Sequence, residues 1–284
     1  MEIVRSIREM QEYTKKWRAN NLSIAFVPTM GALHDGHLEL MRVAKKTADV
    51  CIVSVFVNPL QFGPNEDFAR YPRPIEKDIE LCKTVGVDGV FLPEVHEIYS
   101  ENFSTTVNVG VITEKFEGAS RTSHFQGVTT IVAKLLLATN PDWMMMGQKD
   151  YQQVLVIKKM VSDLNFPVNV VMVPTKRDDD GLALSSRNKY LSDSERKTAL
   201  QIRKALLVGK QLIDNGSKTS KSIEDAMQSV LQSVEGIRID YCSVANAKTL
   251  EKKNELESKE SVVLLIAAFV GTTRLIDNEV VDVH

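Results

Sequence analysis

The chain has 284 residues, of which 43% are hydrophobic and 25% are charged, and its formal net charge is −2. This length allows one large or two modest domains with ample cores, and the composition is ordinary for a soluble globular protein. A charge so close to zero argues against an extended nucleic-acid-binding surface, which normally shows as clustered excess Lys and Arg. Three scattered cysteines fit a reducing compartment, and no apolar stretch reaches the length of a membrane span. We therefore expect a cytoplasmic protein that binds neither nucleic acid nor a membrane.

After a short amphipathic segment, Ile3–Trp17, apolar runs alternate with helical patterns as far as residue 174. The expected strands are Ile24–Val27, Val50–Val57, Gly89–Leu92, Trp143–Met146 and Val168–Val173, with a short outlying strand at Thr105–Val109. The expected helices are Leu38–Thr47, Ile75–Val85, Val128–Ala138 and Tyr151–Leu164. Strands that are apolar throughout and separated by helices predict a parallel sheet covered on both faces.

The pattern changes near Pro174, where a polar loop, Thr175–Gly181, begins. Two long amphipathic helices are expected after it, followed by three strands. These elements are Ser192–Ile213, Ser220–Ser233, Ile237–Val244, Val262–Val270 and Thr272–Ile276. Helices joined to alternating strands, which we expect to be antiparallel, are typical of an α+β domain. We therefore divide the chain into an α/β domain of residues 1–174 and a smaller α+β domain of residues 175–284.

The segment Pro28–His37 directly follows the first buried strand and leads into a helix. His34 and His37 fall on one face of the first helical turn, where unpaired N–H groups and the helix dipole favour an anion. Their imidazoles can donate hydrogen bonds to phosphate oxygens, and Gly31 and Gly36 allow a nucleotide to approach the backbone. The segment resembles the His-x-Gly-His signature of nucleotidylyltransferases and class I aminoacyl-tRNA synthetases.

Two other interpretations of these histidines remain open. They could be ordinary polar residues at a helix start, or they could be two ligands of a metal ion. A zinc site would need further ligands, and Cys51, Cys82 and Cys242 form no ligand pair. We assign no metal ligand.

Three more polar loops follow predicted strands. They are Asn58–Gly63, Gly147–Asp150, and the loop that carries Lys176 and then Leu184–Arg187. In an open parallel sheet, ligands bind beyond the carboxyl ends of the strands. These loops and the segment Pro28–His37, called the histidine loop below, are therefore expected to form one site.

The polar residues of each loop have a possible functional role and also an ordinary structural explanation. Gln61 can grip a substrate that carries hydroxyl and carboxylate groups, or it is a loop amide that satisfies backbone groups. Lys149 can neutralise phosphate charge, or it is a solvated surface lysine. Asp150 can hold Lys149 or a ribose hydroxyl, or it caps the next helix. The hydroxyls and guanidinium of Ser185–Arg187 suit pyrophosphate, but serines are also common where a helix begins.

Five ordered blocks along nearly the whole chain resemble the pantothenate synthetase family. The blocks are Pro28–His37, Asn58–Phe62, Tyr71–Arg73, Gly147–Gln152 with Gln153 next, and Gly181–Asn188. The resemblance implies a dimeric enzyme with a Rossmann-like domain and a smaller C-terminal lid domain. It also implies an ATP-dependent condensation of (R)-pantoate with β-alanine through pantoyl adenylate, which yields pantothenate, AMP and pyrophosphate on the route to coenzyme A.

The same resemblance implies roles for individual residues. The implied catalytic residues are His37, which would be the proton donor, together with His34, Lys149 and Arg187. Gln61 would contact pantoate and β-alanine, and Gln153 would contact pantoate. The implied ATP-binding residues are Met30, Gly31, Ala32, Leu33, His34, Asp35, Gly36, His37, Gly147, Gln148, Lys149, Asp150, Lys176 (through its backbone), Leu184, Ser185, Ser186 and Arg187. Mg²⁺ would accompany the phosphates.

Four positions depart from the family pattern: Gln148 stands where Glu is usual, Thr122-Ser123 where Pro-Gly is more common, and Lys176 where a small apolar residue is common. We assign His124, which follows Ser123, no catalytic role. Two other functions remain open. One is a different adenylating or cytidylyl-transferring enzyme of the same superfamily, and the other is a catalytically silent module that binds nucleotides or tRNA.

Overall fold

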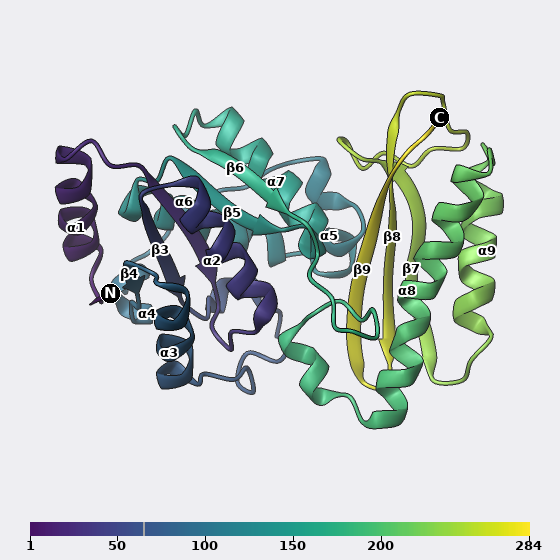
Figure 1. Ribbon diagram of the computed structural model, residues 1–284, viewed down its shortest axis with the longest axis horizontal. Coiled ribbons are helices and arrows are strands. Elements are labelled where there is room, and N and C mark those ends of the chain that lie inside the picture. Colours follow the sequence, from purple (N-terminus) through teal and green to yellow (C-terminus); the bar gives the residue numbers. More distant parts are fainter. Residues whose placement is uncertain (65) are drawn as a thin grey trace. The chain divides into compact units, whose positions relative to one another are not determined.

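The computed structural model describes residues 1–64 and 66–284 and divides into two compact units. The first unit comprises Met1–Gln148 and Gln152–Pro174, and the second comprises Lys149–Tyr151 and Thr175–His284 (Figure 1). The second unit thus includes a short segment, Lys149–Tyr151, that in sequence is flanked on both sides by residues of the first.

The first unit is built on a six-stranded sheet in which every neighbouring pair is parallel. Its strands are β1 (Glu2–Val4), β2 (Ile24–Thr29), β3 (Val50–Val55), β4 (Gly89–Phe91), β5 (Trp143–Gly147) and β6 (Asn169–Val173), in the order β1-β4-β3-β2-β5-β6. From β2 the chain adds β3 and β4 on one side of the sheet and then β5 and β6 on the other, so the strand order reverses between β2 and β5. Open α/β sheets bind ligands at such a point. The carboxyl ends of β3, β2, β5 and β6 are neighbours along one edge, and the expected parallel α/β sheet is confirmed.

Helices connect these strands. Up to Pro174 the α-helices are α1 (Ile7–Ala19), α2 (Asp35–Thr47), α3 (Ile75–Val85), α4 (Val95–Ile98), α5 (Glu117–Ser120), α6 (His124–Thr139) and α7 (Tyr151–Asp163). Short 3-10 turns occur at η1 (Pro59–Gln61), η2 (Ile112–Glu114) and η3 (Gln148–Asp150). The bounds of α3 are those predicted, whereas α2 begins at Asp35 rather than Leu38 because His34 caps it.

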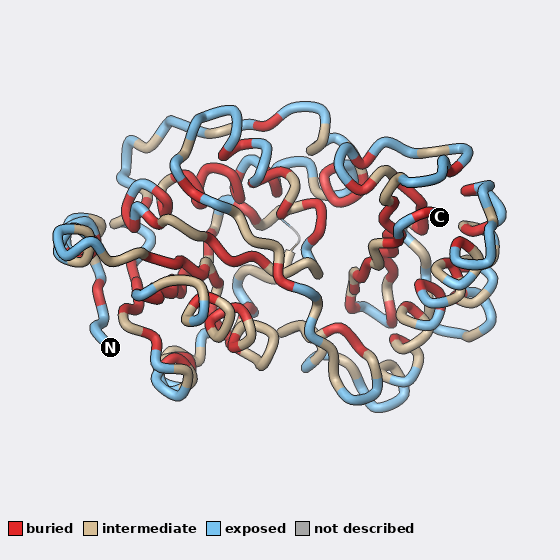
Figure 2. The backbone as a smooth tube through the Cα atoms, turned by 45° about the horizontal axis from the view of Figure 1, so that its top comes forward, coloured by how far each residue is buried: buried red, intermediate tan, exposed pale blue. Residues whose placement is uncertain are grey.

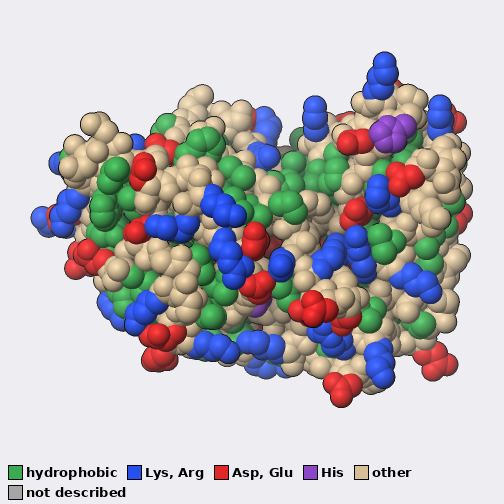
Figure 3. Space-filling view, viewed as in Figure 1, with side chains coloured by type: hydrophobic (Ala, Val, Ile, Leu, Met, Phe, Trp, Pro, Cys, Tyr) green, Lys and Arg blue, Asp and Glu red, His purple; other side chains and the backbone are tan. Residues whose placement is uncertain are grey.

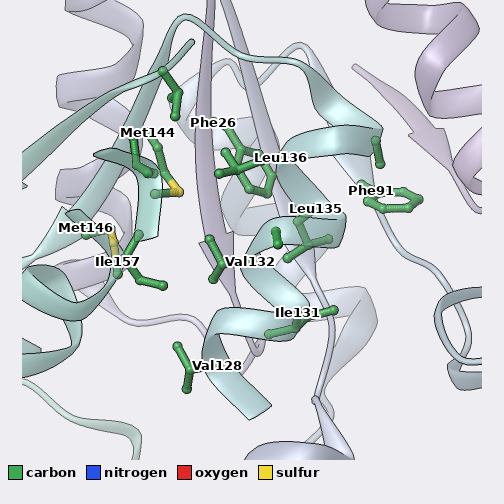
Figure 4. Close-up of a cluster of buried hydrophobic side chains, with 14 of the residues drawn as sticks. Phe26, Phe91, Val128, Ile131, Val132, Leu135, Leu136, Met144, Met146 and Ile157 are labelled. Carbon is green, nitrogen blue, oxygen red and sulfur yellow. The ribbon is translucent and has the colours of Figure 1, made fainter. Parts of the chain in front are cut away.

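The two faces of the sheet pack against separate cores because successive strand side chains point to opposite sides. Phe26 of β2 and Met144 of β5 pack with Leu136 of α6 on the face that α1, α6 and α7 cover (Figure 4). Val27 packs with Met41 of α2 on the other face. Each such large side chain, once fully buried, contributes about 1.5–3 kcal/mol, so both layers are firmly attached to the sheet.

One expectation about an extended segment was wrong. Thr105–Val109 forms no strand; the backbone of Val107 instead bonds to the side chains of Thr129 and Thr130 on α6. The amphipathic start is not one element, because Glu2–Val4 pairs with β4 as an edge strand and α1 begins only after Ser6, whose side chain caps it. Three residues are too few for the period of a strand to show in the sequence.

The second unit is an α+β domain, as expected. Its strands β7 (Ile237–Asn246), β8 (Ser261–Val270) and β9 (Thr273–Asp282) form an antiparallel sheet, and its main helices are α8 (Asp193–Asp214) and α9 (Ser220–Gln232), preceded by the 3-10 helix η4 (Ser186–Tyr190). Both helices pack on the sheet through one apolar cluster that includes Leu206, Met227 and Leu264. β9 runs beyond the predicted Thr272–Ile276 because it pairs along the whole of β8.

Burial and charge follow the same division into layers. Buried residues are concentrated in the strands of both sheets, whereas exposed residues lie on outer helices and loops (Figure 2). On the face shown in Figure 3, Lys and Arg side chains are interspersed with Asp and Glu, as the near-neutral net charge leads us to expect.

Candidate active site

The histidine loop runs from the end of β2 into the first turn of α2. His34 is the N-cap of α2, and its Nδ1 accepts the N–H of Gly36 at 3.2 Å. The Nδ1 of His37 accepts the N–H of His34 at 3.3 Å, and the two ring centroids are 4.1 Å apart. A neutral imidazole whose Nδ1 accepts carries its hydrogen on Nε2. Both rings can therefore donate from Nε2 next to the positive end of the helix, an arrangement suited to phosphate oxygens.

A buried carboxylate shapes the backbone before the histidines. Asp78 of α3 is 1% exposed, and it accepts the N–H of Ala32 at 2.9 Å and that of Leu33 at 2.8 Å. Gly31 and Ala32 have φ values of 79° and 49°, in the left-handed region. A Cβ on Gly31 would lie 2.8 Å from Oδ2 of Asp78, so glycine is needed there for space as well as for φ. Asp78 thus holds the loop in one conformation.

The side chain of Gln61 is oriented by its neighbours. Gln61 ends η1 after β3, and Nδ2 of Asn58 donates both to its Oε1 and to the carbonyl of Gly127, each at 3.1 Å. Tyr99 donates its hydroxyl to Oδ1 of Asn58 at 2.7 Å. Nε2 of Gln61 donates to the sulfur of Met30 at 3.1 Å, which links the loops after β2 and β3. The predicted proximity of these two loops is therefore observed.

His124, on the first turn of α6, supports the backbone of Gln61. Its Nδ1 lies 2.9 Å from the carbonyl oxygen of Gln61 and so donates, while its Nε2 lies 3.1 Å from Nη1 of Arg121 and so accepts. Arg121 also bonds both carboxylate oxygens of Glu66, at 2.6 and 2.7 Å. Burial, aided by the Arg121 cation, lowers the pKa of His124 to about 4. Burial alone would raise the pKa of Glu66, but Arg121 outweighs it and the pKa is lowered.

Lys149 is held within the second unit. Its backbone carbonyl accepts a hydrogen bond from Nδ2 of Asn278 at 3.0 Å, and the hydroxyl of Tyr151 donates to the carbonyl of Ala247 at 2.7 Å. The ammonium of Lys149 lies 3.6 Å from Oδ1 of Asp150, which favours the predicted pairing of these two side chains.

Lys149 and Ser185 line one small cavity of the second unit, together with Asn188, Arg203 and Asp277. Ser185 caps η4 by accepting the N–H of Arg187 at 3.3 Å. Within the second unit, the structure therefore brings two predicted ATP-binding residues, Lys149 and Ser185, to the same cavity.

The polar loop after Pro174 is a short hairpin. Arg177 and Ala183 form an antiparallel bridge, and the carbonyl of Lys176 accepts the N–H of Leu184 at 3.0 Å. The guanidinium of Arg177 binds the buried carboxylate of Asp277 at 2.7 and 3.0 Å, which ties the hairpin to β9. The side chain of Lys176 is exposed, so a role through its backbone remains the appropriate prediction.

The remaining predicted residues are half-buried. Gly147 ends β5, Gln148 begins η3, and Gln153 lies on the first turn of α7. Asp35 lies on the first turn of α2, where it pairs with Arg42 at 3.1 Å. The predicted residues thus divide between the units: the first carries Met30–His37, Gln61, Gly147, Gln148 and Gln153, and the second carries Lys149, Asp150, Lys176 and Leu184–Arg187.

Comparison with known proteins assigns the family. A sequence model described as pantoate-beta-alanine ligase matches residues 2–280. The chain belongs to the pantoate–β-alanine ligase family. A relative named pantothenate synthetase from Moorella thermoacetica is 49% identical over 284 residues, which is 100% of each chain. A second, from Caldicellulosiruptor bescii, is 49% identical over 282 residues, or 99% of each. The chain is accordingly a ligase that joins pantoate and β-alanine through a C–N bond.

Solved structures of this family share the fold. The Thermus thermophilus pantothenate synthetase superposes with a TM-score of 0.92 at 42% identity, covering 98% of this chain and 99% of that one. The Francisella tularensis ligase, solved in complex with beta-gamma ATP and beta-alanine, gives a TM-score of 0.79 at 34% identity, covering 98% and 97%.

Among the described residues there is neither a cluster of metal ligands nor a membrane-spanning helix. Within residues 1–64 and 66–284, no three His, Cys, Asp or Glu side chains are grouped so that they could hold a metal ion. The three cysteines are buried, and burial raises the pKa of each thiol to about 12. In the same part of the chain, no helix is both long enough and apolar enough to cross a membrane.

Sequence analysis missed the residues that hold these site residues in place. Asp78, Asn278 and Tyr151 act through backbone groups far away in sequence, and nothing in the local pattern points to those partners. The sequence did contain one indication of Asn278, because Asp277 and Asn278 are polar residues in an otherwise strand-like segment. Polar side chains that are buried in a strand require hydrogen-bond partners.

Proposed function

We propose that this ligase activates pantoate with ATP before β-alanine attacks. In the first half-reaction a carboxylate oxygen of pantoate attacks the α-phosphorus, and the bond from that phosphorus to the pyrophosphate oxygen breaks. In the second half-reaction the neutral amine of β-alanine attacks the acyl carbon, AMP leaves, and the amine gives up a proton. A carboxylate is a poor acyl donor until AMP becomes its leaving group, so this order follows from the chemistry.

The observation that carries this proposal is the pair of histidines at the start of α2. Because both Nδ1 atoms accept backbone N–H groups, the Nε2–H donors of His34 and His37 are fixed beside a positive helix end. Charge that develops on the α-phosphate would be stabilised there, with His37 as the principal donor and His34 as its partner. Loss of one such preorganised donor typically costs a factor of about 10² to 10³ in turnover.

Pantoate is proposed to bind through Gln61 and Gln153. An amide offers a donor and an acceptor, which suits a substrate that carries hydroxyl and carboxylate groups. The support for Gln61 is its fixed orientation, since Asn58 holds its Oε1 and Met30 receives its Nε2. Gln61 is also proposed to contact β-alanine, which would place the amine near the acyl carbon.

Residues of both units are proposed to bind ATP, with residues 1–174 as the ATP- and pantoate-binding domain and residues 175–284 as the lid domain. Lys149 would neutralise phosphate charge, and the planar guanidinium of Arg187 with the hydroxyls of Ser185 and Ser186 would hold the departing pyrophosphate. The other contacts proposed for ATP are those of Met30–Leu33, Asp35, Gly36, Gly147, Gln148, Asp150, the backbone of Lys176, and Leu184.

Mg²⁺ is proposed to enter as part of the ATP substrate. It retains several waters and takes phosphate oxygens readily, so it needs no cage of protein carboxylates. When bound it would screen the charge of the phosphates. We also propose that the protein forms a homodimer and that it is located in the cytoplasm.

Isotope exchange tests the order of the half-reactions. With labelled pyrophosphate, ATP should become labelled when pantoate and Mg²⁺ are present and β-alanine is absent. The exchange should fall by about 10² to 10³ in His37→Ala, because that variant lacks a donor to the α-phosphate. Exchange that required β-alanine, or that proceeded without pantoate, would contradict the proposed intermediate.

A further inference from the structure

Lys149 follows β5 in sequence, but it is the second unit that fixes its backbone. The segment Lys149–Tyr151 groups with Thr175–His284, while the residues on either side of it group with the parallel sheet. Two hydrogen bonds tie this segment to the rest of the second unit. Asn278 of β9 donates to the carbonyl of Lys149 at 3.0 Å, and Tyr151 donates to the carbonyl of Ala247 at 2.7 Å.

Both donors are themselves rigidly placed. Asn278 is 2% exposed and Tyr151 is 6% exposed, so neither side chain can exchange its acceptor for bulk water without rearrangement. The backbone N–H of Asn278 donates to Oδ1 of Asp277 at 2.8 Å, and the carboxylate of Asp277 is bound by the guanidinium of Arg177. The bond to Lys149 therefore originates from a well-anchored point of β9.

The same part of β9 also lines the cavity that Lys149 lines. Asp277 and Ser185 line that cavity with Lys149, and Arg177 ties the hairpin before Ser185 to Asp277. A lysine side chain has four flexible bonds and loses much rotational freedom when its ammonium must stay at one point. Fixing the backbone at Lys149 leaves only these side-chain torsions to be ordered.

We propose that Asn278, assisted by Tyr151, is a positioning residue that sets where the ammonium of Lys149 lies during adenylate formation. The inference rests on the proposed role of Lys149 toward the phosphates of ATP. Asn278 touches neither substrate nor reacting atom in this account; it acts on the rate through Lys149. A displacement of about 1 Å in a catalytic group can lower the rate about 100-fold.

A double-mutant cycle isolates this effect. Pyrophosphate exchange is measured for Asn278→Ala, Lys149→Ala and the double variant. Asn278→Ala should slow exchange about 10- to 100-fold when Lys149 is present, and less than about twofold when Lys149 is already Ala. The loss should appear in kcat more than in the KM for ATP, since a displaced ammonium still attracts the phosphates.

Other variants keep the test informative if Asn278→Ala folds poorly. Asn278→Asp has nearly the same shape but no amide donor, so it should lose exchange in the same way. Tyr151→Phe should show the same coupling to Lys149→Ala with a smaller loss. The matched control is Tyr13→Phe, because Tyr13 is also 6% exposed and donates to a carbonyl, that of Asp88, at 2.9 Å. This control should leave exchange unchanged.

Two results would overturn the inference, and they are distinct. If Asn278→Ala slowed exchange equally in both backgrounds, Asn278 would support folding rather than Lys149. If Lys149→Ala alone left exchange unchanged, the proposed role of Lys149 toward the phosphates would be contradicted, and the inference about Asn278 would be overturned with it.

Discussion

His34 combines a structural and a proposed chemical role in one ring. Nδ1 caps α2 by accepting the N–H of Gly36, and this contact decides that the hydrogen stays on Nε2, the atom proposed to face phosphate. The ordinary interpretation of a helix-start residue and the catalytic one are therefore compatible. The two roles can be separated, since each uses a different nitrogen.

Replacing His34 with Asn should separate cap from catalysis. Asn is a good N-cap, so the free energy of unfolding should change little, whereas exchange should fall by about 10² to 10³ because the Nε2–H donor is gone. His34→Ala should lose the same activity and, in addition, about 1 kcal/mol of stability. Urea unfolding and pyrophosphate exchange measure the two effects. Equal stability of the two variants would show that the cap contributes nothing.

The buried ring of His124 should make stability depend on pH. Its pKa is lowered from 6.5 to about 4 in the folded protein, whereas unfolding restores the ordinary value. As pH falls below 6.5 the unfolded chain takes up a proton first, so stability should decline from pH 6.5 to about pH 4. The titration of His124 alone should lower the free energy of unfolding by about 3 kcal/mol, and this loss is complete once the pH is below both pKa values.

Urea unfolding of wild type and His124→Asn between pH 7 and 4 tests this pH dependence. Asn can still donate to the carbonyl of Gln61 but does not titrate, so the variant should be less stable at pH 7 and have a flatter profile. Parallel profiles for the two proteins would mean that His124 is not the group responsible.

Among the elements, α3 has an effect beyond its own packing. It lies on one face of the sheet with α2, and Asp78 on its first turn fixes the backbone of Ala32 and Leu33. The conformation of the histidine loop is thus decided by an element more than 30 residues later in the chain, beyond the reach of local patterns.

Asp78→Asn should disturb the histidine loop without removing any histidine. An amide can accept one N–H but presents its own N–H to the other, so one buried donor is left unsatisfied at a cost of about 1–3 kcal/mol. We expect lower stability in urea and slower exchange. Asp49→Asn is the control, because Asp49 also accepts a backbone N–H, from Ser23, but is exposed. Full exchange activity in Asp78→Asn would show that the loop holds its shape unaided.

Across the whole molecule, the predicted site residues divide between two units that fold around separate cores. The first unit carries the residues proposed for pantoate and for the α-phosphate. The second carries Lys149, which is proposed to neutralise phosphate charge, and Arg187, which is proposed for pyrophosphate. A variant of a residue proposed for pantoate and a variant of the residue proposed for pyrophosphate should therefore affect different quantities.

Arg187→Lys and Gln153→Ala test this division. Lys keeps the charge but loses the bidentate fork, so Arg187→Lys should slow pyrophosphate exchange at least about tenfold. The reaction of supplied pantoyl adenylate with β-alanine should change less than about twofold, because no pyrophosphate takes part. Gln153→Ala should instead raise the KM for pantoate in the exchange reaction. Equal losses in both half-reactions for Arg187→Lys would contradict its assignment to pyrophosphate.

The amino-acid sequence was sufficient to predict the parallel sheet, the α+β composition that follows it, the family, and the histidine loop after β2. These features depend on local order: apolar runs, the spacing of His34 and His37, and blocks that stay contiguous along the chain. The short strand β1 and the longer β9 depended on pairing with β4 and β8, and the outlying strand at Thr105–Val109 was lost to side-chain bonds from α6. Asp78, His124 and Asn278 emerged only from the folded chain, since each bonds a backbone group that is remote in sequence. A hydrogen bond depends on distance in space, and no local pattern encodes it when its two groups come from separate elements.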